Sequence, residues 1–420
     1  MTASRQKFVR TDRPGAVLVW VVLSLSVIVG VVAIVLDGGR QFTERRRDQA
    51  AANAAALAGG ANLYANYWTN NGTDPLGTAQ AAAVAAAEAN GVPAGGVTVN
   101  IPPQSGSFAG QAGYVEVIIQ TNLSASFGRV FTQQDLSVQA RAVARGKPMQ
   151  IGLILLAPSG AGTLLVNSPA FSVLNTPIIV DSVDPAAYTQ QSFGVVLASQ
   201  FDITGGYTNP GNAIMIGPIN TGVAPTPDPL WYLPVPSSSS LTTRATSPTT
   251  INSIIPKTLQ PGVYQGGIHV TGLSAVVMQS GIYVMQGGGF VVDSNATVTG
   301  NQVMIYNTTS SSYASGAISV GGLSKVILTA PMSGVYQGIN FFQDRSMTTP
   351  LALAGTGLTS ITGVVYAAEA AVNLTGGALV GADLLGGAFV ANSMTIGGLG
   401  AINVSLGLNP PRVPDVRLVE

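Results

Sequence analysis

The feature that most constrains this chain is an uncharged apolar run close to its N-terminus. Residues 16–36 read AVLVWVVLSLSVIVGVVAIVL and carry no charged side chain over 21 positions. At a helical rise of about 1.5 Å per residue, such a run just crosses a bilayer core of about 30 Å. It exceeds the usual h-region of a signal peptide, about 7–15 residues, and no A-x-A cleavage signal follows it. The run therefore predicts an uncleaved transmembrane helix.

The charges that flank this run bear on its orientation. Four basic residues lie on each side: Arg5, Lys7, Arg10 and Arg13 before it, and Arg40, Arg45, Arg46 and Arg47 after it. Asp37, Glu44 and Asp48 also follow the run, and the large remainder of the chain has few charges that would hinder its transport. We therefore expect residues 1–15 to form a basic cytoplasmic tail, with the bulk of the chain outside the inner membrane, in the periplasm or beyond.

Composition limits what the rest of the chain can be. The 420 residues exceed one ordinary hydrophobic core, so at least two folded units are expected. The chain has 51 glycines and 25 prolines but only 9% charged residues, which favours many turns and an extended β architecture. Cysteine is absent, which excludes disulfides and Cys-based metal sites. Basic residues form no cluster beyond residue 47, so nucleic acid is not an expected partner.

Residues 37–148 are predicted to form a helical stalk and a small α+β unit. An alanine-rich stretch around residues 50–58 continues the membrane helix outward, and residues 76–90 supply a second helix that ends before Gly91 and Pro93. Small side chains on both helices would allow close packing in an αα-hairpin. Three alternating stretches then predict strands, near residues 97–101, 115–119 and 136–140.

This N-terminal region resembles the TadE/TadG-like proteins of the Tad (tight adherence, Flp) pilus assembly system. The resemblance rests on the basic patch, the apolar span, the segment RRRDQAAANAAALAGG, and residues 114–144. The positions that carry the signature are Asp37, Arg40, Arg46, Gln49 and Asn53. The resemblance implies an inner-membrane component of a pilus or secretion machine, with pseudopilin-like character. It implies no catalytic activity. Gly15 is the candidate processing site, although Trp20 stands where the family's processed members carry an acidic residue.

Residues 149–408 are predicted to form an all-β parallel β-helix, that is, a solenoid. Short alternating runs are separated by glycines, as at residues 164–166, 171–173, 178–180 and 201–203. The pattern Gly-Val/Ile-Tyr recurs at residues 262–266, 281–283 and 334–338, and the first two tyrosines lie 19 residues apart, the length of one coil. The residues expected to point inward are Ile268, Val270, Val298, Val303, Ile305, Ile318, Val320, Val372, Leu374, Ile402 and Val404. A propeller is the alternative, but it needs longer and more regular blades.

A segment rich in proline and serine interrupts the repeats at residues 221–250. It is predicted to be an exposed loop that lies on the solenoid wall, or a tether or docking element around Trp231 and Tyr232. Residues 409–420 are predicted to be a C-terminal tail.

Candidate catalytic residues are few in this chain. His269 is the one histidine, and strand alternation turns it outward from Ile268 and Val270. Asp344 and Arg345 are adjacent and are expected to brace a turn. Asp293, Glu369 and Asp383 lie in different coils. No HExxH, P-loop, GxSxG or calcium-repeat motif is present. The sequence therefore predicts neither cofactor nor metal, and no enzyme.

Three classes of function remain, in decreasing order of support. The first is a membrane-anchored structural or assembly component of a Tad/Flp-type pilus or secretion system. Its expected partners are inner-membrane lipid and other proteins of that machine. The second is a surface adhesin or glycan-binding solenoid. The third is a polysaccharide-active β-helix enzyme, which would need two separated carboxyl groups that face a shared bond.

Overall fold

The structure is a computed structural model of the whole chain. It describes residues 14–124, 135–149, 152–355, 359–376, 383–385, 387–398, 401–405 and 413–420. The chain divides into two compact units: unit 1 comprises residues 1–148 and 414–420, and unit 2 comprises residues 149–413. Each unit is described separately below.

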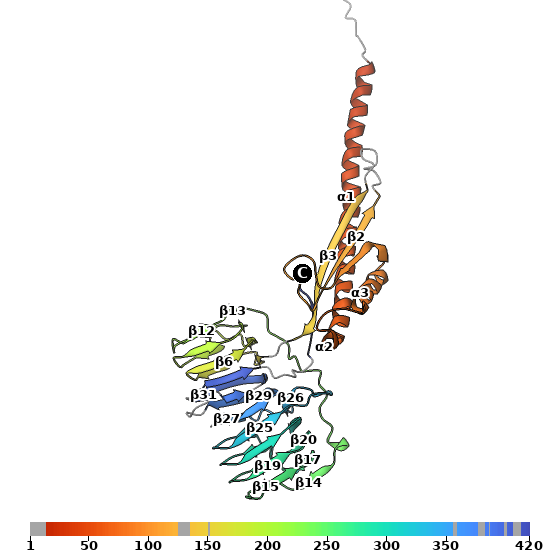
Figure 1. Ribbon diagram of the computed structural model, residues 1–420. Helices are drawn as coiled ribbons and strands as arrows, with labels where there is room; N and C mark the ends of the chain where they lie inside the picture. Colours follow the sequence, from red (N-terminus) through yellow and green to blue (C-terminus); the bar gives the residue numbers. More distant parts are fainter. Residues whose placement is uncertain are drawn as a thin grey trace, which may run out of the picture. The chain divides into compact units, whose positions relative to one another are not determined.

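A single long helix, α1 (Pro14–Ala65), dominates unit 1 (Figure 1). It contains the predicted membrane span and continues into the predicted stalk without a break. In the described part of the chain, it is the one helix long and apolar enough to cross a bilayer, with a mean hydropathy of 2.9 in its apolar window. Beyond a short helix, α2 (Tyr67–Asn70), the chain forms α3 (Thr78–Ala89). Alanines of α1 and α3 are fully buried, so small side chains allow the two helices to pack closely.

The sheet of unit 1 has the strand order β1-β2-β3-β33, and all its neighbours are antiparallel. The strands are β1 (Val97–Asn100), β2 (Tyr114–Leu123), β3 (Leu136–Pro148) and β33 (Pro414–Leu418). Val115, Val117 and Ile119 point toward the two helices and are fully buried. Gly146 allows the closest approach of α1 to β3, because a Cβ atom there would lie 2.2 Å from the carbonyl oxygen of Gly60.

The predicted C-terminal tail is not a tail in the structure. Residues 414–418 form β33, which pairs with β3 in a register that places Pro414 opposite Pro148. The backbone N–H of Val143 also donates to the carbonyl of Glu420 at 2.8 Å. A strand this short, with two charged residues among five, has too weak an alternation to be recognised without its partner. The sheet of unit 1 is therefore complete only after the chain has returned from unit 2.

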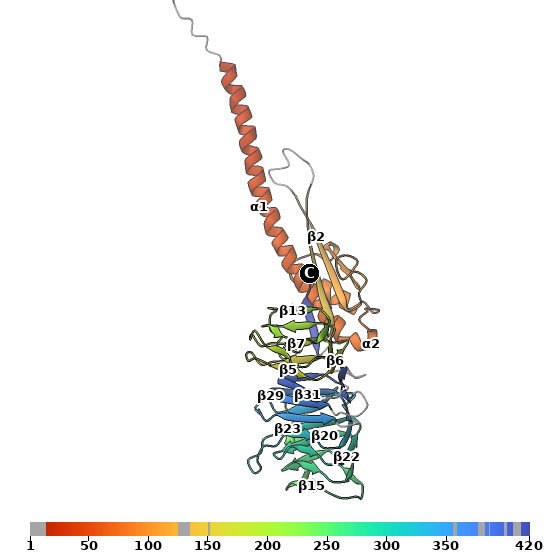
Figure 2. The same ribbon diagram turned by 90° about the vertical axis from the view of Figure 1, so that its left-hand side faces the viewer.

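Unit 2 is a parallel β-solenoid with three strand positions per coil (Figure 2). The first position holds β4 (Leu153–Leu155), β7 (Ile178–Val180), β10 (Phe201–Ile203), β13 (Ile219–Thr221), β14 (Thr243–Ala245), β17 (Gly262–Gln265), β20 (Gly281–Gln286), β23 (Val303–Thr308) and β26 (Ile339–Gln343). The second position holds β5 (Leu164–Asn167), β8 (Tyr188–Gln190), β11 (Tyr207–Thr208), β15 (Thr249–Ile251), β18 (Ile268–Val270), β21 (Phe290–Val292), β24 (Ile318–Val320) and β27 (Leu351–Gly355).

Two longer strands, β29 (Val364–Gly376) and β31 (Phe389–Gly398), run through both of these positions. The third position holds β6 (Ala170–Leu174), β9 (Val195–Leu197), β12 (Ile214–Ile216), β16 (Lys257–Leu259), β19 (Ala275–Met278), β22 (Thr297–Gly300), β25 (Lys325–Thr329), β28 (Ser360–Thr362), β30 (Asp383–Leu385) and β32 (Ala401–Ser405).

The inner core of the solenoid follows the predicted alternation. Nine of the side chains predicted to point inward are buried: Ile268, Val270, Val298, Val303, Ile305, Ile318, Val320, Val372 and Leu374. The side chains of Ile402 and Val404 lie outside the described residues. A single coil cannot bury its apolar face, so stacking on both sides supplies the core. Glycine is required at close corners: Gly288 has φ +67°, and a Cβ atom there would lie 1.9 Å from the carbonyl oxygen of Gly266.

The predicted repeat interval needs correction. Tyr264 and Tyr283 do lie in successive coils with stacked rings, 6.0 Å between centroids, but the register partner of Tyr264 is Met285. One coil here is therefore 21 residues long, from 264 to 285. The third copy of the pattern, at residues 334–338, is a turn before β26 and not a strand. The third segment therefore resembles the first two in sequence but differs from them in local structure.

The coils do not stack in the order of the sequence. The chain enters at β4, builds β7, β10 and β13 in one direction, then crosses to β14 and builds β17, β20, β23, β26, β29 and β31 back toward β4. The last of these, β31, pairs in parallel with β4. In Figure 2, the blue strand β31 accordingly lies beside the yellow-green strands β5 and β6. The entry and exit of the solenoid therefore lie side by side, and the Met149 N–H donates to the Val413 carbonyl at 2.9 Å.

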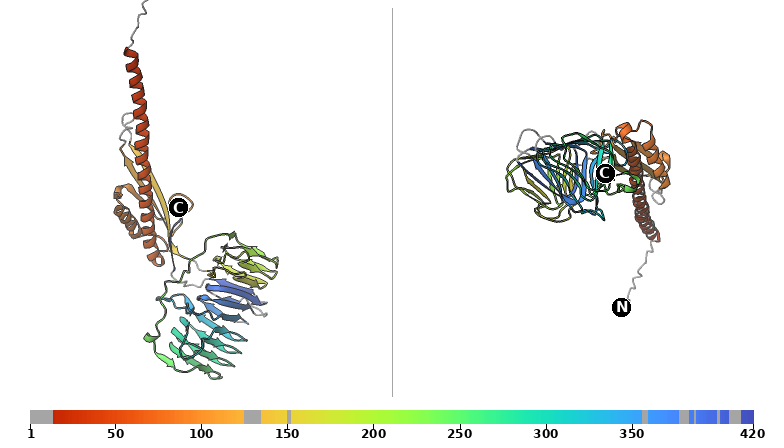
Figure 3. Two further views of the ribbon diagram at one scale, coloured as in Figure 1. Left: turned by 180° about the vertical axis from the view of Figure 1, so that it is seen from behind. Right: turned by 90° about the horizontal axis from the view of Figure 1, so that it is seen from below.

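The crossing from β13 to β14 consists of residues 222–242, which we call the strap. The strap covers an outward-facing apolar column of the first strand position, which we call the apolar wall. The wall consists of Val263, Val284, Tyr306, Phe342, Tyr366, Val390, Ile154 and Ile179. Leu230 and Leu233 of the strap are buried against it. Figure 3 shows the crossing from behind, as a long connection alongside the stacked strands.

Candidate functional site

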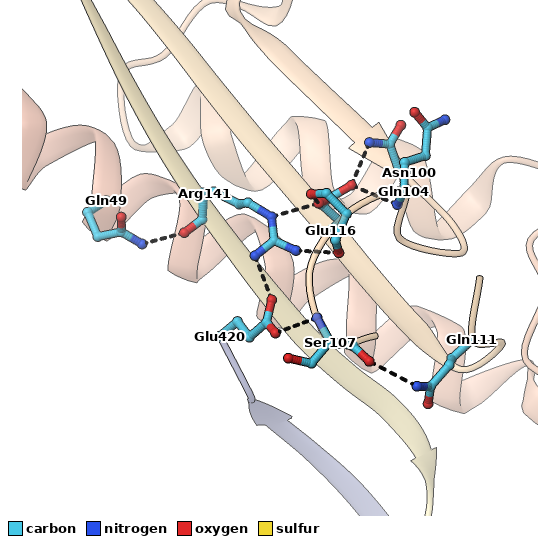
Figure 4. A network of polar contacts seen from close by, with 9 residues as sticks. Gln49, Asn100, Gln104, Ser107, Gln111, Glu116, Arg141 and Glu420 are labelled. Carbon is cyan, nitrogen blue, oxygen red and sulfur yellow. Dashed lines mark hydrogen bonds and ion pairs between the residues drawn. The ribbon is translucent and has the colours of Figure 1, made fainter. Parts of the chain in front are cut away.

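The densest polar cluster of unit 1 centres on Glu116, a fully buried carboxylate on the sheet face opposite the helices (Figure 4). Alternation along β2 places it there between Val115 and Val117. The loop after β1 supplies donors: the Asn100 side chain at 2.8 Å, the Gln104 backbone at 3.0 Å, and the Ser105 hydroxyl.

Arg141 on β3 joins Glu116 to the end of the chain. Its Nε atom donates to Glu116 at 2.7 Å and its Nη1 atom to Glu420 at 2.6 Å. Its Nη2 atom donates to the Ser105 carbonyl at 2.8 Å. Glu420 also accepts from the Ser107 backbone N–H at 3.0 Å. One guanidinium therefore holds the loop after β1, the strand β2 and the last residue of the chain. We call this cluster the Glu116 network.

The hydrogen-bond donors around Glu116 determine its charge state. Burial raises the pKa of Glu116, but the hydrogen bonds from Ser105, Gln104, Asn100 and Arg141 outweigh burial and lower the pKa to about 2. A carboxyl group with this pKa stays ionised near neutral pH. Its contribution to stability is present above the ordinary pKa of 4.5 and is lost as the pH falls through about 2.

A second ion pair holds the returning strand. Arg145 on β3 lies 3.0 Å from Asp415 on β33, and Asp415 also pairs with Arg417 at 3.2 Å. Together with the Glu116 network, these contacts fasten residues 414–420 onto β3. The two chain segments that lead into and out of the solenoid are therefore neighbours in one sheet of unit 1.

The positions that carried the family resemblance have identifiable places in α1. Gln49 donates to the Arg141 carbonyl at 2.9 Å, which fastens α1 to β3, and to the Asn53 side chain one turn on at 3.0 Å, which orients the Gln49 amide. Arg46 lies over the Phe42 ring, with 5.1 Å between the guanidinium carbon and the ring centroid. Asp37 is buried, Arg40 is exposed, and Gly15 lies in the first turn of α1. Residues 1–13 lie outside the described part.

The strap is anchored in unit 2 by Arg345. Its Nη2 atom donates to the Leu230 carbonyl at 2.8 Å, and its Nη1 atom donates to the Leu233 carbonyl at 3.2 Å. Its Nε atom donates to the Tyr366 hydroxyl at 2.6 Å, and that hydroxyl donates to Asp228 of the strap at 2.6 Å. The guanidinium also stacks on Phe342 and Tyr366. Arg345 braces a long crossing, not only its own turn.

Asp344 fastens its own turn to β23 of the neighbouring coil. It accepts hydrogen bonds from the Ser346 backbone at 2.9 Å and from the hydroxyl groups of Tyr306 and Thr308. The insertion thus lies on the solenoid wall, as one of the two sequence interpretations had it. Trp231 and Tyr232, central to the other interpretation, are 72% and 42% exposed on the outer side of the strap.

Among the remaining candidate catalytic residues, the described part of the chain brings His269 and Asp293 together. His269 points outward and lies 2.8 Å from Asp293, which also accepts from Thr271. Glu369 is exposed in β29, and the side chain of Asp383 is outside the described residues. Within the described part of the chain, no group of three or more histidine or carboxylate side chains could hold a metal ion.

Asp181, beside the strap, gives a pH-dependent prediction. It is 6% exposed and accepts the Thr226 N–H at 2.9 Å. Burial raises its pKa to about 6 from 3.8, against the hydrogen bond, which lowers it. The ionised form is therefore disfavoured by folding. Asp181 therefore costs no stability below pH 4, and its contribution becomes unfavourable as the pH rises through about 6.

We expect Asp181→Asn to raise the free energy of unfolding by up to about 3 kcal/mol at pH 8, and by less than about 1 kcal/mol at pH 4. The asparagine retains an oxygen for the Thr226 N–H. Urea denaturation of the detergent-solubilised protein at both pH values measures the difference. Asp202→Asn, on the next coil, is the control, with a change below about 0.5 kcal/mol. An equal gain at both pH values would contradict the assignment to Asp181 ionisation.

Sequence reasoning missed Glu116, Arg141, Glu420 and the role of Arg345. The one available signal was a charged residue at position 116, between Val115 and Val117, in the apolar first half of its strand. Its charged partner Arg141 lies 25 residues away, Glu420 lies a further 279 residues beyond Arg141, and no local pattern connects the three.

Comparison with known proteins gives one match. Residues 15–62, nearly the whole of α1, match the model of the Tad family, described as Flp pilus-assembly TadE/G-like. No curated protein and no solved structure matches the chain. The match covers the apolar span, the alanine-rich stretch and all the signature positions from Asp37 to Asn53. The chain thus carries a TadE/G-like Tad domain at residues 15–62, followed in its C-terminal part by a parallel β-solenoid.

Proposed function

We propose that this protein is a single-pass inner-membrane component of a Tad/Flp-type pilus or secretion machine, which displays a β-solenoid on the side of the membrane opposite its N-terminus. The observation that best supports this proposal concerns the two ends of the solenoid. The chain leaves unit 1 at Pro148 and returns to it at Pro414, and these two residues pair in one sheet. The solenoid is an insertion in a unit that the Tad domain anchors. The partners of the protein would be membrane lipid and other proteins of the machine.

The role is scaffolding and assembly rather than catalysis. Glu116 is held ionised by its partners, Arg345 braces the strap, and His269 pairs with a surface carboxylate. Each of these side chains is engaged in a structural contact. This supports display of a surface as the task of the solenoid.

Deletion of the gene in the host strain tests the proposal. We expect loss of surface pili or of adherence, and recovery on expression of the full-length chain. A deletion variant lacks residues 149–413 and joins Pro148 to Pro414 through an Asn-Gly hairpin, because those residues already face each other in antiparallel strands. It should reach the membrane fraction without restoring function. Normal piliation in the deletion strain would refute the proposal.

A glycan-binding solenoid is the second candidate. A groove of about 450 Å³ runs over β19 and β22. Its polar lining residues are Gln279, Ser280, Thr299 and Asn301, beside the apolar Val277, Met278 and Ile327. Amide and hydroxyl groups suit an uncharged sugar. Binding of the purified protein to a glycan panel, abolished by Asn301→Ala, would support this candidate, and failure across the panel would exclude it.

A further inference from the structure

A second pocket lies in unit 1, where α1 leaves the apolar span. It has a volume of about 330 Å³ and is open to solvent. Gln41, Phe42 and Arg45 of α1 line one side, and Ser137 and Gln139 of β3 line the other. Gln41, Phe42 and Arg45 lie within the matched Tad domain, and none of the five residues takes part in the Glu116 network.

The position of the pocket along α1 is set by helix geometry. The apolar run ends at Leu36, so Gln41 lies about 7 Å and Arg45 about 13 Å beyond the hydrocarbon edge at a rise of about 1.5 Å per residue. The headgroup layer is about 5–7 Å thick on each side of the bilayer. Long arginine side chains can reach back several ångströms toward the interface. If α1 crosses the bilayer, the pocket opens at the lipid headgroups.

The lining of the pocket has a recognisable chemistry. Arg45 is exposed, and among the described residues no carboxylate forms an ion pair with it. Gln41, Ser137 and Gln139 contribute neutral polar residues to the lining, and the Phe42 ring is 62% exposed. A guanidinium beside neutral donors suits a phosphate group. An exposed aromatic ring suits the boundary between headgroups and acyl chains.

Two carboxyl groups lie near Arg45 in the sequence. Glu44 precedes Arg45, and adjacent residues point about 100° apart around a helix, so Glu44 does not line the pocket. Asp48 is fully buried, and its carboxyl group does not line the pocket. Neither opposes an anion in the pocket strongly.

We propose that this pocket binds the headgroup of an anionic phospholipid, with the phosphate on Arg45 and the headgroup hydroxyls on Gln41, Ser137 and Gln139. The inference rests on the membrane anchoring in the proposed function. A bound lipid would connect β3 of unit 1 to the bilayer surface and limit rotation of α1.

Native mass spectrometry of the full-length protein in a neutral detergent tests this site. The probes are dihexanoyl phosphatidylglycerol, dihexanoyl phosphatidylcholine and inorganic phosphate, at equal ionic strength. We expect one saturable phosphatidylglycerol adduct, weaker phosphatidylcholine binding and no retained phosphate. Arg45→Gln should weaken phosphatidylglycerol binding about tenfold or more. Ser137→Phe, which fills the pocket from an exposed strand position, should do the same. Arg417→Gln is the matched control in unit 1 and should bind as wild type.

Equal binding of the two lipids, phosphate binding as strong as lipid binding, or unchanged affinity in both pocket variants would overturn the proposal. Fractionation of host membranes separates this failure from that of the anchor. Protein that is membrane-bound but lacks lipid selectivity would refute the pocket alone. Protein absent from the membrane fraction would refute both.

Discussion

Replacing Arg141 with methionine should destabilise unit 1 by about 3 kcal/mol, because Glu116 would remain buried without its cation. The cost lies at the low end of the range for a broken buried pair, since three other donors still reach Glu116. The loss should also release the C-terminus, because the same guanidinium holds Glu420. Urea denaturation of the full-length protein in detergent, followed by hydrogen exchange of β2 and β3, measures both effects.

Arg417→Met is the matched control for this change. Arg417 is also an arginine of the same sheet, but it is largely exposed and pairs with Asp415 at the surface, so we expect a change below about 0.5 kcal/mol. Equal effects of the two substitutions would show that Arg141 acts as an ordinary surface residue. Glu116→Gln together with Arg141→Met should recover part of the loss, because the buried charge is then removed.

Replacing Arg345 with alanine should release the strap from the apolar wall. The substitution removes the donors to the Leu230 and Leu233 carbonyls and the partner of the Tyr366 hydroxyl. Hydrogen bonds from a charged donor contribute about 1.5–3 kcal/mol each, and they are not additive, so we expect local opening to become easier by about 3 kcal/mol. Hydrogen exchange in residues 222–242 should then accelerate about 100-fold.

Two variants test the specificity of this effect. Arg345→Lys should give an intermediate rate, because an ammonium group cannot reproduce the two-pronged contact with both carbonyls. Arg244→Ala removes an arginine that donates to a single carbonyl, that of Pro261, in an end coil, and should leave the strap unchanged. Wild-type exchange in Arg345→Ala would mean that Leu230 and Leu233 hold the strap by burial alone.

Much of the local structure could be predicted from the sequence. An uncharged run of bilayer length has few alternative structures, and alanines on successive turns allow only close helix packing. Alternation at residues such as Ile268 and Val270 identified the inward face of a solenoid, because each coil repeats the same requirement. These signals all lie within about one turn or one coil.

The order of the coils could not be predicted in this way. Periodicity reports that a segment is a coil, but every coil presents similar backbone edges to both neighbours. The local sequence of β31 would look the same whether this strand ended the solenoid or paired with β4. Likewise, residues 414–418 look like a tail until β3 is beside them. The Glu116 network and the Arg345 anchor depend on these long-range arrangements and were missed for that reason.

The central claim is that the solenoid and the N-terminal tail lie on opposite sides of a membrane and are joined through α1. The chain has no cysteine, so a single introduced thiol reports one position without background. Ser311→Cys lies in an exposed turn of the solenoid, and Ser4→Cys lies in the N-terminal tail. Cells with a permeabilised outer membrane are treated with a membrane-impermeant maleimide. We predict labelling of the Ser311→Cys variant in these cells, and labelling of the Ser4→Cys variant only after lysis; the reverse pattern would contradict the account.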